Sequence, residues 1–426
     1  MSEAERNWPG GLTLEPFRAT RYSGVDLAAV TSPPYDVVEP DRSSRLEAAN
    51  PYNVVRLILP RCVDAGDRYR EATRVWHSWI HDKVLCTDDQ AALWVYEQSG
   101  AAGTLVGVVG TIPIDQPTAV LPHEDVMPAP VEDRAELMDS IGVNLEPILL
   151  VHDPAPSLPV GQAVSETTRI VDEVRQTTPA FEVATDDGAH HRLWAITDEP
   201  AHARITADLQ QRSALIADGH HRFAAYQRIQ RKRRLHSLSS GTQPWDRGLA
   251  LVVDGHAHPL HLGAIHRVVH ELDMATAISR LGPGIEQHDV ENLATAQTWL
   301  REASSVPRLV VTDGHQWTGL TAPDAVEIVP RADRSPQWRQ LPTALLHELL
   351  LPIRWQMHDD AVTYHHDIPG ALRNAVSEGI AVLLPALSLT TVIDRAAAGE
   401  LLPQKSTSFG PKPRSGLLMR TFEDGT

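Results

Sequence analysis

Cysteine is scarce in this chain of 426 residues. Only Cys62 and Cys86 occur, and neither has a partner at the spacing of a zinc knuckle. A zinc ribbon and a disulfide framework are therefore excluded, and so few thiols are typical of a reducing compartment. We expect a cytoplasmic protein without structural cross-links.

Long apolar runs are also missing. No uninterrupted apolar stretch is long enough to cross a membrane. Residues 1–10 are polar, with acids and a proline, unlike the apolar core of a secretory signal peptide. The sequence therefore predicts no membrane association.

Positive charge is in deficit, with 38 Lys and Arg against 55 Asp and Glu and a formal net charge of −17. Such a mean field repels nucleic acids and anionic membranes, so direct binding to either is not expected. The overall charge does not exclude a local basic pocket that binds a small anion. The 42% of hydrophobic residues and the length predict a globular chain with two or three sub-domains.

Motifs of several common enzymes are absent. There is no Gly-x-Ser-x-Gly elbow and no His-Glu-x-x-His pair, which disfavours ordinary hydrolases and zincins. The segment Lys405-Ser406-Thr407 resembles the end of a phosphate loop, but the Gly-rich part that should precede it is missing. We also find no repeat of solenoid length.

Helical and strand patterns alternate along the chain, which predicts an α+β (mixed α/β) fold. Strands are expected at residues 54–59 and 214–217, helices at residues 40–49, 68–82, 131–141, 221–234, 343–350 and 368–377, and hairpins at Gly188, Gly255 and Gly314. We predict a first region over residues 1–270, a second over 271–400 and a returning loop and strand over 401–426.

Asp-Gly-His occurs three times, and the copies differ in context. At Asp254 and Asp313, apolar strand residues flank both sides, which predicts ordinary hairpin turns. At Asp218 a strand enters and a helix leaves. Gly219 would let the backbone approach a ligand closely, and the helix N-terminus that follows favours an anion.

Two interpretations of the Asp218 segment stay open. In the first, His220, His221 and Arg222 donate to a phosphate, with the Arg222 fork as the main grip. Asp218 would then hold a divalent cation or accept a proton from a substrate hydroxyl. In the second, Asp218 only caps a helix whose histidines are exposed.

Three further sets of polar residues are candidates. The pair His123-Glu124 supplies a metal ligand or general base, or lies in a surface loop. Lys405-Ser406-Thr407 holds phosphate or belongs to a flexible basic tail, although Phe409 and Pro411 favour packing onto the protein. A loose histidine cluster forms a metal site or a solvated sheet face; its members are His256, His258, His261 and His266.

The chain resembles the large bacterial and archaeal family known as DUF1015 in motifs that run from near its start to near its end. The matching stretches are Pro33-Pro34-Tyr35-Asp36-Val37, residues 50–57, Pro122-His123-Glu124, Glu132-Asp133-Arg134, residues 217–223, His266-Arg267-Val268 and residues 403–412. The resemblance implies a ParB/sulfiredoxin-like nucleotide-binding core with an additional C-terminal α/β region. That fold includes ATP-dependent kinases of free L-serine.

The resemblance also implies roles for residues, together with ATP (or ADP) and Mg²⁺ as cofactors. The phosphates would be held by Gly219, His220, His221 and Arg222, with Lys405, Ser406 and Thr407 closing over them. Asp218 and Glu124 would hold the metal, Asp218 is the central catalytic residue, and Glu124 or Asp36 would deprotonate the hydroxyl. Substrate would be bound by His123, Arg134 and Tyr35.

The chain departs from the family pattern at several positions. Val131 stands where a lysine is expected, Asp125-Val126 where a threonine is expected, and Ser408 and Gly410 where an aromatic residue is usual. These changes predict a shifted substrate or reduced activity. A nucleotide-binding regulatory protein with slow NTP hydrolysis and a histidine-based metalloenzyme are the alternatives. Expected partners are a nucleotide and a small molecule, and a homodimer stays open.

Overall fold

A computed structural model describes residues 10–62, 67–116, 118–152, 164–237, 239–302 and 304–422. The chain forms two compact units. Unit 1 comprises Met1–Pro122, Val126–His261 and Gly410–Thr426, and unit 2 comprises His123–Asp125 and Leu262–Phe409. The C-terminal segment therefore divides, because residues up to Phe409 belong to unit 2 and the rest returns to unit 1. The predicted mixed α/β class is confirmed.

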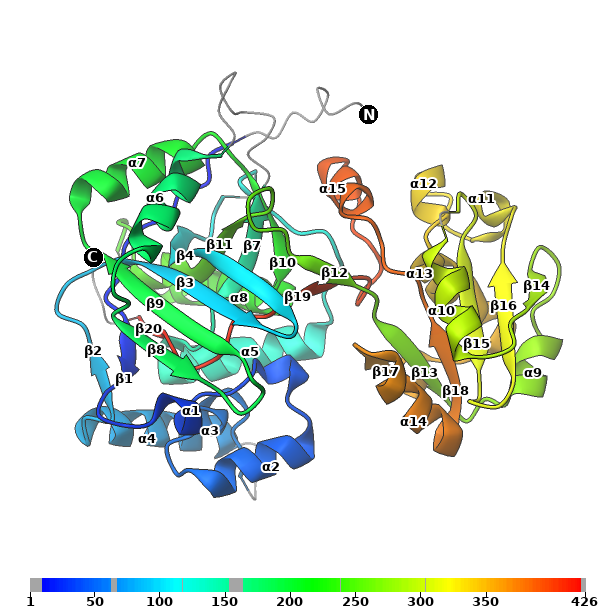
Figure 1. Ribbon diagram of the computed structural model, residues 1–426, viewed down its shortest axis with the longest axis horizontal. Helices are drawn as coiled ribbons and strands as arrows, with labels where there is room; N and C mark the ends of the chain where they lie inside the picture. The colour runs from blue at the N-terminus through cyan, green and yellow to red at the C-terminus, as the bar shows by residue number, and fades with distance from the viewer. Residues whose placement is uncertain are drawn as a thin grey trace. The chain divides into compact units, whose positions relative to one another are not determined.

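Unit 1 is built on an eight-stranded mixed sheet in the order β5-β10-β7-β11-β4-β3-β9-β8 (Figure 1). β10 runs parallel to β5, β11 runs parallel to β7, and the other neighbours are antiparallel. The strands are β3 (Leu93–Gly100), β4 (Gly103–Pro113), β5 (Val120–Leu121), β7 (Ile148–His152), β8 (Phe181–Ala184), β9 (His190–Ile196), β10 (Ala214–Asp218) and β11 (Arg247–Asp254). Two small antiparallel pairs join β1 (Thr20–Tyr22) to β2 (Leu85–Thr87) and β6 (Val143–Asn144) to β20 (Arg420–Thr421).

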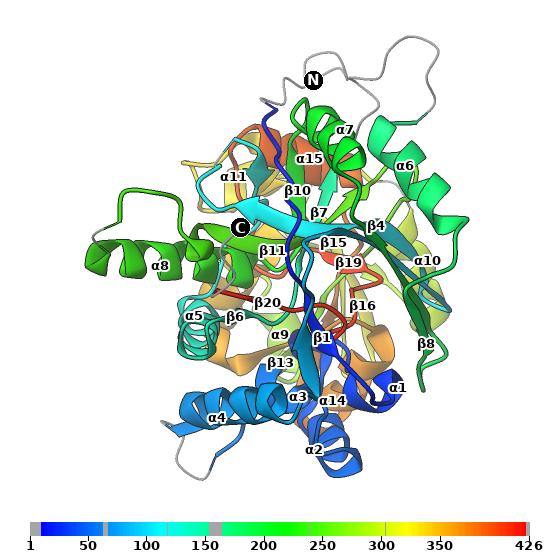
Figure 2. The ribbon, with the colours of Figure 1, turned by 90° about the vertical axis from the view of Figure 1, so that its left-hand side faces the viewer.

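Helices cover one face of this sheet and fill the space beside it. Their bounds are α1 (Leu27–Val30), η2 (Tyr35–Val37), α2 (Pro40–Ala49), α3 (Val55–Ile58), α4 (Arg68–His81), α5 (Pro128–Ile141), α6 (Glu166–Arg175), α7 (Glu199–Leu209), α8 (His220–His236) and η5 (Pro244–Asp246). α5 packs on both α8 and α4, and Figure 2 shows α5 between the other two helices. Apolar residues of α5, α6, α7 and α8 share one core with the sheet. The helices predicted over residues 40–49, 68–82, 131–141 and 221–234 are confirmed.

The strand predicted over residues 54–59 is wrong, because this segment forms the helix α3. The Asn53 side chain accepts a hydrogen bond from the Val55 amide at 3.0 Å and so turns the backbone into the helix. Val55, Leu57 and Ile58 are all buried in a second core of unit 1. A short apolar run of this kind has no periodicity that separates a strand from a buried helix.

The last part of the chain covers the other face of the unit 1 sheet. Pro413, Leu417 and Leu418 lie against sheet residues that point away from the helices, among them Tyr96 and Leu251. Two reciprocal backbone hydrogen bonds join Ser32 and Ser415, at 2.9 and 3.2 Å. These contacts hold residues 411–418 firmly beside the loop at residues 31–37.

Unit 2 contains a six-stranded antiparallel sheet in the order β14-β16-β15-β18-β13-β17. Its strands are β13 (His266–His270), β14 (Glu286–Asp289), β15 (Arg308–Thr312), β16 (Trp317–Thr321), β17 (Val362–His365) and β18 (Gly379–Leu383). Residues alternate between two cores: Leu309 and Val311 face one, and Val310 faces the other. This alternation follows from the two-residue period of a strand and lets helices pack on both faces.

The described helices of unit 2 are α9 (Met274–Ser279), α10 (Leu293–Arg301), α11 (Ala325–Ile328), α12 (Pro336–Arg339), α13 (Pro342–Ala344), η6 (Leu345–Trp355), η7 (Asp359–Ala361), α14 (Ile368–Glu378) and α15 (Leu389–Ala397). The longest of them are the π-helix η6 and the helix α14, with 11 residues each. The helix predicted over residues 343–350 is confirmed but continues as the π-helix η6, and the one over 368–377 is confirmed as α14. The strands β12 (His261–Gly263) and β19 (Ser408–Gly410) pair with each other.

The predicted hairpins have different outcomes. Those at Gly188 and Gly314 are confirmed, since β8 pairs with β9 and β15 pairs with β16. The hairpin at Gly255 is wrong, because β11 pairs with β4 and β7 whereas β12 pairs with β19. The Asp254 carboxylate instead accepts bonds from the amides of His256 and Ala257, both at 3.0 Å, and closes a turn.

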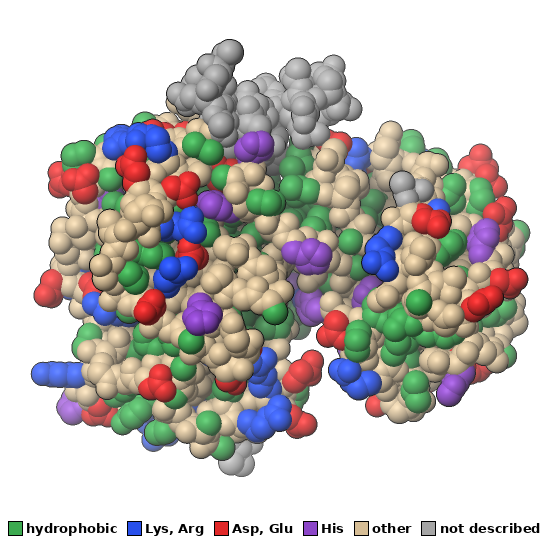
Figure 3. Space-filling view, viewed as in Figure 1, with side chains coloured by type: hydrophobic (Ala, Val, Ile, Leu, Met, Phe, Trp, Pro, Cys, Tyr) green, Lys and Arg blue, Asp and Glu red, His purple; other side chains and the backbone are tan. Residues whose placement is uncertain are grey.

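None of the helices in the described residues is both long enough and apolar enough to cross a bilayer. On the face seen in Figure 3, acidic and basic side chains are interspersed rather than gathered by sign. The net charge of −17 is therefore not concentrated in one acidic patch on that face.

Candidate functional site

The predicted strand-to-helix junction lies in unit 1, where β10 ends at Asp218 and α8 begins at His220. Gly219 joins them as the helix N-cap with φ 96° and ψ 27°. A Cβ atom at this position would lie 2.9 Å from Cγ2 of Ile148 and 3.2 Å from the Arg222 guanidinium. Only glycine therefore fits both the left-handed backbone and the space at this junction.

Arg222 fixes the junction from inside the protein. Its side chain is 4% exposed; Nη2 donates to Oδ2 of Asp218 at 2.5 Å and Nη1 donates to the Pro147 carbonyl at 2.6 Å. Burial opposes the charged form, but the Glu146 and Asp218 carboxylates outweigh it and raise the pKa of Arg222. The guanidinium is thus a fixed positive charge in the first turn of α8.

Lys412 supplies a second cation from the far end of the chain. Its Nζ lies 2.6 Å from Oδ1 of Asp218 and also forms a short ion pair with Oδ2 of Asp36. Burial disfavours the ammonium, but the two carboxylates outweigh burial and raise the pKa of Lys412. Both oxygens of Asp218 are therefore bound by a cation, one by Arg222 and one by Lys412.

The loop before α2 places Asp36 and Tyr35. Pro34 precedes the short helix η2 with φ −62°, and the Tyr35 amide donates to Oε1 of Glu146 at 3.2 Å. The Tyr35 ring lies 4.5 Å from the Arg134 guanidinium carbon and 5.9 Å from that of Arg222. Such ring–guanidinium contacts are attractive and orient the aromatic side chain.

The two histidines of the junction are buried, at 6% exposure for His220 and 8% for His221. Nε2 of His221 accepts a hydrogen bond from the Met127 amide at 3.1 Å, which anchors the segment that leads into α5. The alternative of a capped helix with exposed histidines is therefore wrong, and the N-cap is Gly219 rather than Asp218.

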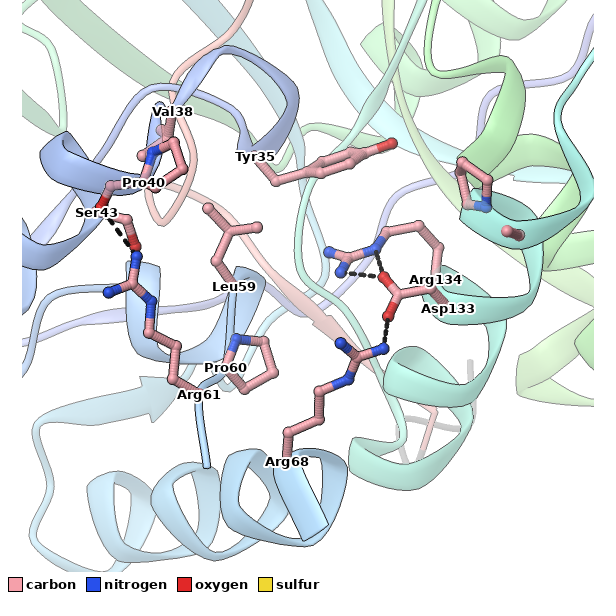
Figure 4. Close-up of a pocket in the computed structure, with 12 residues that line it drawn as sticks. Tyr35, Val38, Pro40, Ser43, Leu59, Pro60, Arg61, Arg68, Asp133 and Arg134 are labelled. Atoms are coloured by element: carbon pink, nitrogen blue, oxygen red, sulfur yellow. Dashed lines mark hydrogen bonds and ion pairs between the residues drawn. The ribbon is translucent and has the colours of Figure 1, made fainter. Parts of the chain in front are cut away.

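A cavity of about 620 Å³ in unit 1 has Tyr35 and Arg134 in its wall. Figure 4 shows Arg68 and Arg134 converging on Asp133, with Leu59 and Pro60 among the apolar lining. Asp133 binds Nη2 of Arg68 at 2.5 Å and Nε of Arg134 at 2.9 Å. The wall of the cavity is thus partly apolar and partly formed by arginine side chains, and the arginines outnumber the single carboxylate.

The remaining predicted site residues belong to unit 2 and contact one another there. Nε2 of His123 lies 2.7 Å from the Thr407 hydroxyl, and the Glu124 carboxylate accepts from the Ser406 amide at 3.1 Å. Thr407 lies 3.4 Å from the same carboxylate. Lys405 has φ 56°, and its carbonyl accepts from the buried Arg267 at 2.9 Å. The expected packing of Phe409 is confirmed, since it is buried against His123.

Lys412 lies between the Asp36 and Asp218 carboxylates, so this pair does not hold a Mg²⁺ ion as it stands. The predicted metal site on Asp218 and Glu124 involves residues of both units and stays a prediction. Within the described part of the chain, no three His, Cys, Asp or Glu side chains gather as metal ligands. The metal-site alternative for the histidine cluster thus has no support in these residues. His266 is not on a solvated face either: burial lowers its pKa to about 4, and its Nδ1 accepts a hydrogen bond from the Leu384 amide.

The missed member of the site is Lys412. Sequence reasoning gave the cationic role to Lys405 and treated Lys412 only as part of a matching stretch. The signal available was the unusual Pro411-Lys412-Pro413 triplet, since each proline fixes its own φ and Pro413 also restricts the backbone of Lys412.

Gly219→Ala should destabilise unit 1 more than the same change at Gly142. Both glycines have positive φ, 96° and 74°, which costs an alanine roughly 1–2 kcal/mol. Only Gly219 has Ile148 and Arg222 within 3.2 Å of the added Cβ, whereas Gly142 has open space. Urea unfolding of both variants measures the difference, and equal losses would show that the tight junction contributes nothing.

Comparisons place the chain in a family but give it no role. A family model described as "Protein of unknown function (DUF1015)" matches residues 14–344. No curated protein matches the chain. It is similar to a solved conserved hypothetical protein from Pyrococcus furiosus, with a TM-score of 0.39 and 15% identity over 74% of this chain and 96% of that one.

Two further solved structures are similar at the same distant level. One is a free serine kinase in complex with AMP, with a TM-score of 0.38 and 15% identity over 71% of this chain and 87% of that one. The other is SbnI with a C-terminal truncation from Staphylococcus aureus, with a TM-score of 0.37 and 12% identity over 74% of this chain and 87% of that one. At such scores no residue of this chain takes a role from either structure.

Proposed function

Because this chain belongs to the DUF1015 family, whose function is unknown, we propose a function from its own site. We propose an ATP- or ADP-dependent phosphotransferase that acts on the hydroxyl of a small molecule, with free L-serine or a related hydroxy amino acid as the first candidate. The observation that carries the proposal is the buried cluster of Asp36, Asp218, Arg222 and Lys412 at the start of α8.

The cluster offers the groups that phosphoryl transfer requires. This reaction needs little covalent help from the protein, but it needs cations around the phosphates and correct positioning of the acceptor. Arg222 and Lys412 are such cations, and both are mostly buried, with side chains 4% and 12% exposed. The first amides of a helix have no intrahelical acceptor, so the N-terminus of α8 adds donors for a phosphate.

The charge of the cluster predicts how a nucleotide would bind. The cluster contains the carboxylates of Asp36, Asp218 and Glu146 but only two cations, Lys412 and Arg222. One negative charge is therefore not neutralised. A bare phosphate therefore meets a net negative environment. We expect a nucleotide to bind more tightly when a divalent cation accompanies its phosphates, and those phosphates to hold the cation while Lys412 occupies the Asp36–Asp218 pair.

Residue roles follow from this arrangement as parts of the proposal. Arg222 and Lys412 would contact the phosphates, and Asp36 would accept the proton of the acceptor hydroxyl. Tyr35 and Arg134 would bind the acceptor from the cavity wall. The proposed phosphate contacts of Lys405, Ser406 and Thr407, the substrate contact of His123 and the catalytic role of Glu124 stay predictions for unit 2.

A thermal-shift panel tests the proposal. ATP, ADP and CTP are each added with and without Mg²⁺ and L-serine to the natural chain and to Asp218→Asn. A ligand that binds only the folded state raises the unfolding temperature, so we expect a Mg²⁺-dependent nucleotide shift. Asp218→Asn should weaken this shift, because Asp218 holds both Arg222 and Lys412 in place. Product analysis follows with serine and other hydroxy amino acids.

The outcomes separate the candidate functions. A phosphorylated amino acid supports the phosphotransferase. A nucleotide shift without any phosphorylated acceptor would instead support a regulatory protein that hydrolyses nucleotide slowly. No shift with any nucleotide would contradict both, and metal analysis of the purified protein would then test the histidine-based metalloenzyme.

A further inference from the structure

The ammonium of Lys412 lies where two carboxylates of unit 1 face each other. It contacts one oxygen of Asp36 and one oxygen of Asp218, the latter at 2.6 Å. The two carboxyl groups are 17% and 11% exposed, so water screens their charges only in part. Two carboxylates this close to one cation would repel each other strongly if the cation were removed.

The backbone around Lys412 is held at several points. The Arg414 guanidinium donates to the Thr31 hydroxyl at 2.7 Å and to the Thr31 carbonyl at 3.0 Å, and the Arg414 amide donates to the Tyr96 hydroxyl at 3.2 Å. The Ser415 hydroxyl also binds Glu146. These contacts fix the base of the lysine side chain, so its ammonium is placed by the fold rather than by chance on a mobile tail.

We propose that Lys412 occupies the position of a divalent cation between Asp36 and Asp218, so that the ammonium and a metal ion are alternative occupants of this carboxylate pair. Oxygen ligands of this kind suit Mg²⁺ and Mn²⁺, and Mg²⁺ often takes only one or two carboxylates while keeping several waters. The natural chain therefore excludes free divalent metal from the pair. This proposal concerns the same cluster as the proposed function but does not require phosphoryl transfer.

Arg222 would stay bound to Asp218 when a metal ion replaces the Lys412 ammonium. Arg222 binds the other oxygen of Asp218, and its second nitrogen donates to the Pro147 carbonyl. Removal of Lys412 therefore takes one cation away from each carboxylate, while Arg222 still orients Asp218. A metal that enters would meet oxygens already held in place.

The test is a titration of the full chain with Mn²⁺ alone, followed by the electron paramagnetic resonance signal of free Mn²⁺, without nucleotide. We expect no stoichiometric binding by the natural chain. Lys412→Ala should bind Mn²⁺ at least about tenfold more tightly, because the two carboxylates then keep only Arg222 as a neighbouring cation and attract the ion. The same variant with Asp36→Asn should lose this gain, and Mg²⁺ should compete with Mn²⁺ for the new site.

Lys232→Ala is the matched control, since it also removes one positive charge from unit 1 but from an ion pair with Asp139 whose lysine is 62% exposed. It should bind Mn²⁺ no better than the natural chain. If Lys412→Ala folds poorly, Lys412→Gln keeps most of the side chain without its charge, and added Mn²⁺ should raise its unfolding temperature.

Two results would overturn the proposal. One is stoichiometric Mn²⁺ binding by the natural chain that is unchanged in Lys412→Ala. The other is a folded Lys412→Ala or Lys412→Gln that gains no Mn²⁺ affinity over Lys232→Ala. Neither result depends on nucleotide binding, so the failure of this proposal and the failure of the proposed function are distinguishable.

Discussion

Arg222→Leu should lower the free energy of unfolding of unit 1 by about 3–5 kcal/mol, the range for removing one partner of a buried ion pair. Arg222 is 3% exposed and holds Asp218 at 2.5 Å, and the Glu146 and Asp218 carboxylates both favour its charge. Leucine would leave these carboxylates buried with less positive charge beside them. It would also leave the Pro147 carbonyl without its donor.

Arg228→Leu is the matched control on the same helix. Arg228 pairs with Glu132, but the two side chains are 52% and 57% exposed, and such surface pairs contribute at most about 1 kcal/mol. Urea unfolding followed by circular dichroism compares the two variants with the natural chain. Similar losses in both would contradict a special role for Arg222, whereas Arg222→Lys should restore part of the stability by returning the charge.

The alternation of elements was predictable mainly from the turn and break signals that bound each element. The helices α2, α5 and α8 and the strand β10 lie beside such signals, among them Asn50-Pro51, Pro128 and Asp218-Gly219. The helix α3 was not predictable in this way, since its four residues are buried almost all round and its start depends on the Asn53 side chain. The pairing of β11 with β7 rather than with β12 depends on distant partners that a local turn signal does not reveal.

The place of Gly219 in the site could be predicted from the sequence, whereas the place of Lys412 could not. Asp218 to Arg222 lie within one strand-to-helix turn, so the local sequence pattern is enough to predict the junction between the strand and the helix. Lys412 reaches Asp36 across 376 positions of the chain, and such a contact exists only after the C-terminal segment has returned to unit 1. The burial of His220 and His221 likewise depends on packing that no local pattern determines.

Asp36→Asn should lower the turnover of the proposed phosphotransfer by about 10²–10⁴-fold, the usual contribution of a general base. Asp36 shares Lys412 with Asp218, so phosphates that draw the ammonium toward themselves would release the Asp36 carboxylate beside the acceptor hydroxyl. Asparagine keeps the shape of the side chain but accepts no proton. Nucleotide binding should persist, because Arg222 and the N-terminus of α8 are unchanged.

The measurement is kcat and its pH profile for the natural chain, Asp36→Asn, Asp36→Glu and Glu124→Gln. A general base gives an acidic limb in the profile of the natural chain that Asp36→Asn lacks and that Asp36→Glu keeps with lower turnover. Glu124 is the other candidate base, but its carboxylate is engaged by the Ser406 amide at 3.1 Å, so Glu124→Gln should change turnover less. A large loss in Glu124→Gln together with an active Asp36→Asn would move the base to Glu124. A loss in Asp36→Asn that leaves the acidic limb in place would instead show that Asp36 serves only to position Lys412.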